Sequence, residues 1–340
     1  MMLSRVAENM YWFARYLERV EDTARCITVN TNLFLDLPKG YAPGWEPLLQ
    51  ITGLMEQYRT RHGAVNEKNT LRFLLGEPDN PSSVLASLAS ARENLRTTRD
   101  MMPPDAWEHL NGLYLFAQDG LDAGLTRRGR YDYLAGIITR VQEITGLLMG
   151  TMSHDDAYAF LRIGRNMERA DMTSRILDVR SADLLGREEA GAEGTSPFTT
   201  IQWMHVLRSL SAYEAYRRAV HPRVSAAAAL GFLLLNENFP RSVYHAYGVI
   251  ATSLEGLPRH DHPLRLVRRL MRVLKQADLQ HLANDGQARA SYLDDLQRQM
   301  GECHQSLNAM YFLMDQSTAM SSAAPGSGDG TQSQGQRQGA

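Results

Sequence analysis

A charged segment occurs twice in the chain, 150 residues apart, and each copy lies within a long stretch of helical periodicity. Residues 15–25 and 165–175 carry Arg, Glu, Arg, Thr and Arg in register, and an acidic residue follows three positions after each glutamate. Positions i, i+3 and i+4 of a helix share one face, so each copy presents an Arg–Glu–Arg cluster. Charged side chains rarely enter an apolar interface unpaired. The repeat therefore predicts that two equivalent long helices pack together with these charges between them.

The two clusters are the candidate site of the chain, and two compatible interpretations of them remain open. In the favoured one, the charges form a buried ion-pair network, in which loss of one partner costs about 3–5 kcal/mol. In the other, the arginines are bidentate donors to a carboxylate or a phosphate of a ligand. The residues concerned are Arg15, Glu18, Arg19, Arg165, Glu168 and Arg169.

The hydrophobic pattern is helical almost throughout, and no convincing alternating strand occurs. We therefore expect an all-α protein, a bundle of roughly a dozen helices in which two equivalent long helices carry the Glu-Arg motifs. Residues 1–320 should form a single helical domain, with a candidate internal boundary in the loop of residues 186–198. Residues 321–340 are mostly Gly, Ser and Gln, a composition typical of a disordered tail. The spacing of the repeat suggests two similar halves, but the intervening helices cannot be matched one to one.

Composition excludes several classes of protein. The 36 basic and 38 acidic residues give a net charge of −2, which argues against a general nucleic-acid binder. Two cysteines, Cys26 and Cys303, form no disulfide framework and fit a reducing cytoplasm. The N-terminal residues lack the uncharged segment of a signal peptide, and no apolar run is long enough for a membrane span. We expect a cytoplasmic protein.

No motif for a cofactor or a metal is recognisable. A Gly-rich phosphate loop is absent, so ATP binding by this chain is not expected. The ten histidines show no metal-binding spacing. The pairs Asp155-Asp156 and Asp294-Asp295 lack the third aspartate of the magnesium motif of isoprenoid synthases. The sequence therefore predicts neither a cofactor nor a metal.

Two further segments are candidate contact sites. Arg241 and Ser242 follow Pro240 at the expected start of a helix, where free backbone N–H groups attract anions. A tight helix–helix turn is the favoured interpretation of this segment. Residues 265–275 form a basic amphipathic helix, which is more typical of a solvated face than of a site for an acidic partner.

Three segments resemble the alpha-E domain family of bacterial all-α proteins. Residues 2–19 resemble the N-terminus of that family, and residues 162–173 resemble its second Glu-Arg signature. The segment from Phe232 to Val243 is similar to a third signature. The resemblance implies an all-α fold and assigns no catalytic residues. Because genes of this family accompany circularly permuted ATP-grasp ligases and transglutaminase-like peptidases, it also implies a part in peptide or amide ligation and processing.

Two functions follow as expectations. The favoured one is an accessory or scaffold component that binds the ligase, its substrate or its product. The alternative is an enzyme that acts on a carboxylate or phosphorylated substrate through the Glu and Arg clusters. The sequence leaves open whether the chain is catalytic, and it does not specify the oligomeric state.

Overall fold

The computed structural model describes residues 3–36, 44–188, 197–220 and 223–312. Within these ranges the chain forms sixteen α-helices and no strand, which confirms the all-α fold. The number exceeds the expected dozen because several helices, such as α2 and α7, are only one or two turns long. The first eight are α1 (Ser4–Asp36), α2 (Glu46–Ile51), α3 (Met55–His62), α4 (Glu67–Leu75), α5 (Val84–Thr97), α6 (Pro104–Asp119), α7 (Leu121–Leu125) and α8 (Arg130–Thr151). The others are α9 (Asp156–Glu188), α10 (Pro197–Ser209), α11 (Tyr213–Ala219), α12 (Ala226–Leu235), α13 (Val243–Glu255), α14 (Asp261–Lys275), α15 (Leu279–Asn284) and α16 (Gly286–Leu307).

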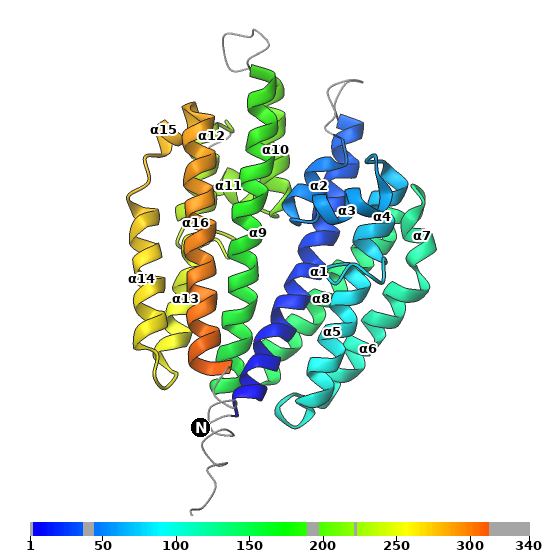
Figure 1. The fold of residues 1–340 in the computed structure, drawn as a ribbon, viewed down its shortest axis with the longest axis vertical. Coiled ribbons are helices and arrows are strands. Elements are labelled where there is room, and N and C mark those ends of the chain that lie inside the picture. The colour runs from blue at the N-terminus through cyan, green and yellow to red at the C-terminus, as the bar shows by residue number, and fades with distance from the viewer. Residues whose placement is uncertain (1–2, 37–43, 189–196, 221–222, 313–340) are drawn as a thin grey trace, which may run out of the picture.

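The two longest helices, α1 and α9, form the centre of the molecule (Figure 1). Each has 33 residues, and both run upward from the lower end of Figure 1, where they cross and then diverge. The crossing is tight at Gly164, because a Cβ atom there would lie 2.2 Å from the carbonyl oxygen of Tyr11. Glycine thus lets the two backbones approach closely enough for their charged side chains to meet.

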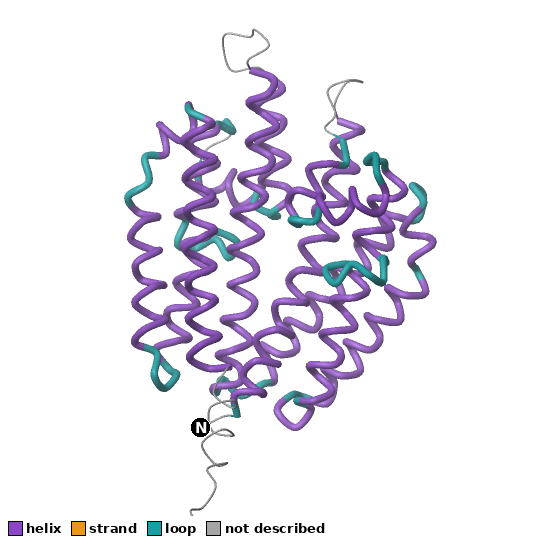
Figure 2. Tube along the Cα trace, viewed as in Figure 1, coloured by secondary structure: helices purple, strands orange, loops and turns teal. Residues whose placement is uncertain are grey.

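The two long helices have equivalent sets of partners. Helix α1 packs against α5 and α8, and both of these pack against α6. In the same way α9 packs against α13 and α16, and both pack against α14. Figure 2 shows the two groups as separate bundles on either side of the central pair. The short helices follow the same symmetry, since α2 of the first group contacts α9 and α10 of the second contacts α1.

Sequence equivalences outside the long helices support this symmetry. Residues 73–84 contain Phe-Leu-Leu and then Pro-Ser-Ser-Val, and residues 232–243 contain Phe-Leu-Leu and then Pro-Arg-Ser-Val. In each segment a serine caps the following helix, because the Ser83 hydroxyl accepts the N–H of Ala86 and the Ser242 hydroxyl accepts that of His245. The chain is therefore an internal duplication, whose halves are α1–α8 and α9–α16.

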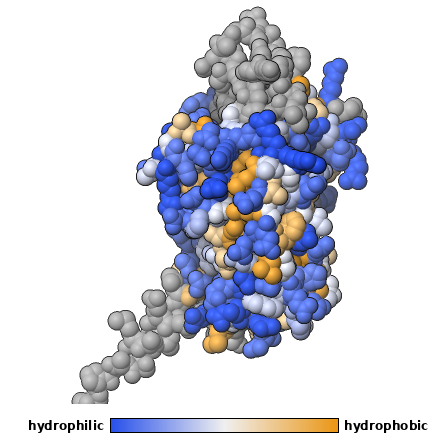
Figure 3. All heavy atoms as spheres, turned by 90° about the vertical axis from the view of Figure 1, so that its right-hand side faces the viewer, coloured by the Kyte–Doolittle hydropathy of each residue, from blue (hydrophilic) through white to orange (hydrophobic). Residues whose placement is uncertain are grey.

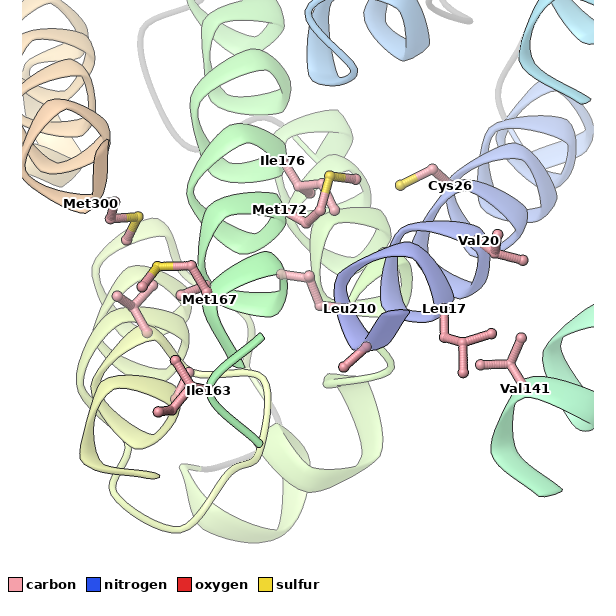
Figure 4. Close-up of a cluster of buried hydrophobic side chains, with 14 of the residues drawn as sticks. Leu17, Val20, Cys26, Val141, Ile163, Met167, Met172, Ile176, Leu210 and Met300 are labelled. Carbon is pink, nitrogen blue, oxygen red and sulfur yellow. The ribbon is translucent and has the colours of Figure 1, made fainter. Parts of the chain in front are cut away.

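The core lies between the long helices and their neighbours (Figure 4). Leu17 of α1 faces Val141 of α8, and Met167 of α9 faces Met300 of α16. These pairs occupy corresponding positions in the two halves. The outer face of the first half is polar around its margins, and apolar side chains gather mainly in a band down its middle (Figure 3). None of the described helices is both long enough and apolar enough to cross a bilayer.

Two expectations fall partly or wholly outside the described residues. Helix α9 continues through Gly186 to Glu188, and α10 begins at Pro197, so only residues 189–196 of the expected loop lie outside. The predicted tail of residues 321–340 also lies outside.

Candidate functional site

The first Glu-Arg cluster joins the two halves at the crossing of α1 and α9. Arg15 Nε and Arg19 Nε donate to the two carboxylate oxygens of Glu168, each at 2.6 Å. The Glu168 side chain is 2% exposed. Burial disfavours its ionised form, but the two guanidinium groups outweigh burial and lower the pKa of Glu168 to about 2. This carboxylate is therefore charged at neutral pH, as the sequence repeat predicts for a paired residue.

The second cluster repeats this arrangement with the helices exchanged. Arg169 of α9 binds both oxygens of Glu18 on α1, at 2.7 and 2.9 Å. Arg241, just before α13, approaches the same carboxylate at 3.2 Å. Although burial opposes ionisation, these two arginines lower the pKa of Glu18 to about 2. The equivalence of Glu18 and Glu168 predicted from the repeat thus extends to their hydrogen bonds and protonation.

Arg241 inserts into an acidic group on α1. Besides Glu18, its guanidinium contacts Glu21 at 3.1 Å and makes a short ion pair with Asp22. Its backbone carbonyl accepts a hydrogen bond of 2.9 Å from the Thr173 hydroxyl on α9. Burial and the neighbouring carboxylates raise the pKa of Asp22 to about 7, even though Arg241 opposes this shift. The sequence predicts Arg241 as a residue at the start of a helix, and no sequence pattern connects it with the Glu-Arg clusters.

Arg165 departs from the sequence prediction. By the repeat it corresponds to Arg15, yet it forms no ion pair or hydrogen bond with any residue of the described chain. Glu18 instead takes its second arginine from Arg241, which contacts the Oε1 atom that Arg169 also binds. Burial and the nearby charge of Arg169 lower the pKa of Arg165. The predicted symmetry of the four arginines is therefore wrong at this position.

Ser242 is used entirely by the fold. Its side chain is fully buried, accepts the N–H of His245 at 3.1 Å and donates to the carbonyl of Asn236. The hydroxyl thus caps α13, and its hydrogen bond to Asn236 fixes the preceding turn. This is the arrangement expected for a tight helix–helix turn, and it leaves no hydroxyl proton for an anion.

A hydrogen-bonded chain that the sequence analysis missed extends the first cluster. Arg15 Nη1 donates to the Tyr11 hydroxyl at 3.2 Å, and that hydroxyl lies 2.8 Å from Nδ1 of His304. Burial and the charge of Arg15 lower the pKa of His304 to about 4, so the imidazole is neutral at pH 7. In the tautomer that carries its proton on Nε2, Nδ1 accepts the Tyr11 proton. No sequence signal relates residues that lie 293 positions apart.

A pocket of about 160 Å³ opens beside the first cluster. It lies between α1, α9, the end of α2 and the residues that precede α5. Arg175 lines it and donates to Asp171 at 2.9 Å along the same helix. Its polar lining comprises Arg15, Arg19, Thr23, Thr52, Ser82, Glu168, Asp171 and Arg175. Within the described ranges no group of three or more His, Cys, Asp or Glu side chains is placed to hold a metal ion.

Comparison with known proteins places the duplicated fold in a family. The model of the Alpha-E family, described as a predicted alpha-helical domain with a conserved ER motif, matches residues 2–312. The chain belongs to the Alpha-E family. Within it, the paired Glu18-Arg19 and Glu168-Arg169 are the two Glu-Arg motifs whose geometry is given above.

Three relatives of this Alpha-E chain are longer proteins. Uncharacterised proteins of Mycobacterium bovis and of two strains of Mycobacterium tuberculosis are 23% identical to it over 310 residues, which is 83% of this chain. The matched region is 34% of each relative, so the chain spans about a third of their length. No solved structure matches the chain.

Proposed function

We propose that this protein is an accessory binding component of an ATP-grasp-linked peptide or amide ligation system. The observation that carries the proposal is the architecture of the mycobacterial relatives, in which the Alpha-E region is about a third of a longer chain. Joining two domains in one chain raises their effective concentration, which is useful when they act on the same molecule. A circularly permuted ATP-grasp ligase and a transglutaminase-like peptidase are the partners that the family resemblance suggests.

The chemistry of the signature residues supports binding over catalysis. A general acid or base works best when its pKa lies near the operating pH. Glu18 and Glu168 instead have pKa values of about 2, and each is bound by two arginines. Such carboxylates hold guanidinium groups in fixed positions. The arginines that Glu168 orients, Arg15 and Arg19, line the pocket and are suited to an anionic group of a ligase substrate.

The test uses the purified chain with and without its cognate ATP-grasp protein. Alone, it should show no ATP turnover and no amino-acid ligation. Mixed with the ligase, it should co-elute in size-exclusion chromatography or change the rate of ligation. Absence of both effects would refute the accessory role. ATP turnover by the isolated chain that disappears in Glu168→Gln would instead establish the alternative, an enzyme acting on a carboxylate or phosphorylated substrate.

A further inference from the structure

The two halves of the duplication differ at a position beside the signature glutamate. The residue at this position decides whether the space between α1 and α9 is filled. Ser82 precedes the cap Ser83 as Arg241 precedes the cap Ser242, so the two residues correspond. In the second half, Arg241 reaches between α1 and α9 and fills the space beside Glu18. In the first half, the shorter Ser82 lines the open pocket beside Glu168. The pocket is thus the unfilled counterpart of the Arg241 site.

The charges around the pocket select the sign of its ligand. Asp22, one of the three carboxylate partners of Arg241, corresponds through the repeat to Met172 in the pocket wall. The lining therefore contains three arginines and two carboxylates, an excess of one positive charge (3 − 2). A cation that entered the pocket, as Arg241 does in the other half, would meet no carboxylate at the position of Asp22. An anion, in contrast, meets guanidinium groups that are already held in position.

Two of the three hydroxyl side chains that line the pocket have no hydrogen-bond partner among the described residues. In the second half, Thr173 donates its proton to the carbonyl of Arg241. Its counterpart Thr23 is 3% exposed, lines the pocket and makes no hydrogen bond with any described residue. The Ser82 hydroxyl likewise has no partner in the described part of the chain. Ser82 is half-buried and both hydroxyls line the pocket, so an oxygen acceptor bound there can take a hydrogen bond from each.

The size of the pocket limits the ligand to an end group. Its volume of about 160 Å³ is well above the roughly 10–15 Å³ that a single water molecule needs on the same measure. Sites for whole drug-sized ligands are larger, about 300–1,000 Å³. A carboxylate or phosphate group fits this volume, whereas a nucleotide does not.

We propose that this pocket, which we call the Ser82 pocket, binds a small oxyanion at the end of a substrate, a carboxylate or a phosphate. Arg15, Arg19 and Arg175 supply the charge, and Thr23 and Ser82 donate hydrogen bonds. The inference rests on the proposed function only for the origin of the ligand, which would be the molecule that the ligation system handles. Binding itself is a property of the isolated chain.

The test is calorimetric titration of the full chain at low salt and pH 7 with two probes, inorganic phosphate and N-acetylglycine. We expect at least one probe to bind, and the tighter one identifies the phosphate or the carboxylate as the recognised group. Arg175→Ala should weaken binding at least tenfold, whereas Arg25→Ala, its counterpart in the filled half, should not. Binding of neither probe at millimolar concentration would overturn the proposal.

A filled variant separates the pocket from the general surface charge. Ser82→Arg combined with Met172→Asp rebuilds in the first half the pair that Arg241 and Asp22 form in the second. The variant should keep the melting temperature and lose the probe. Probe binding that persists in it would mean an adventitious surface site and would refute the pocket. Because no ligase is present, these results are independent of whether the complex with an ATP-grasp protein forms.

Discussion

The Glu168→Gln substitution tests whether the Glu-Arg clusters hold the halves together. Glutamine keeps the size of the side chain but removes the charge that Arg15 and Arg19 share. The pKa of Glu168 falls from an ordinary 4.5 to about 2 in the folded protein. Since one pKa unit corresponds to about 1.36 kcal/mol, the ionised form contributes about 3 kcal/mol to the free energy of unfolding at pH 7. This agrees with the cost of about 3–5 kcal/mol for breaking a buried ion pair.

The pH dependence of the loss distinguishes charge from packing. Because the pKa is lowered by folding, the stabilisation is complete above pH 4.5 and disappears as the pH falls through about 2. The difference between wild type and variant, measured by urea unfolding, should therefore shrink from about 3 kcal/mol at pH 7 to about 1 kcal/mol at pH 3. Glu93→Gln, which removes an exposed ion pair with Arg96, serves as the control and should have no measurable effect. A loss below about 1 kcal/mol at pH 7, or one that does not vary with pH, would refute the reasoning.

Three other results are expected. Gly164→Ala should destabilise the protein by about 1–3 kcal/mol in urea unfolding, since the added methyl would meet the Tyr11 carbonyl, a backbone group that cannot rotate away; unchanged stability would contradict the tight crossing. Ser242→Ala and Ser83→Ala should each cost about 1 kcal/mol as lost helix caps, and a neutral result for both would contradict their shared role. The His304 imidazole should titrate near pH 4 by NMR, and stability should fall as the pH drops from 6.5 towards 4, because the unfolded chain takes up the proton first. A titration midpoint of the imidazole above pH 6 would contradict the hydrogen-bonded series from Arg15 through Tyr11 to His304.

The sequence predicted the central charge pairing because the repeat is in register and helical spacing fixes which side chains share a face. Arg15, Arg19 and Glu168 meet as that argument requires. It failed for Arg165, because Arg241 supplies the second arginine of Glu18. Arg241 belongs to a distant segment, 219 residues from its other partner Asp22 in the chain. Spacing along one helix carries no information about a residue that arrives from another.

The full duplication was hidden by a change of spacing. The Glu-Arg segments are 150 residues apart, whereas Phe73 and Phe232 are 159 apart, because the second half has nine more residues before this point. A search at one fixed offset therefore finds the long helices and misses the rest. The structure reveals the equivalence through contacts: the rings of Tyr58 and Phe73 meet edge to face at 5.3 Å, and Tyr216 meets Phe232 at 5.6 Å.

Each cluster takes its glutamate from one half and its arginines from the other. Among the described residues, Glu168 of the second half forms its ion pairs with arginines of α1, and Glu18 of the first half forms its ion pairs with Arg169 and Arg241. Neither half therefore supplies the arginines that bind its own signature glutamate, Glu18 or Glu168. We expect separately expressed fragments, one ending after α8 and one beginning at α9, to be poorly folded alone and to associate when mixed, as the subunits of an obligate dimer do. The two halves thus depend on each other as the subunits of a dimer do, while the differences Ser82/Arg241 and Met172/Asp22 make the two equivalent sites unequal.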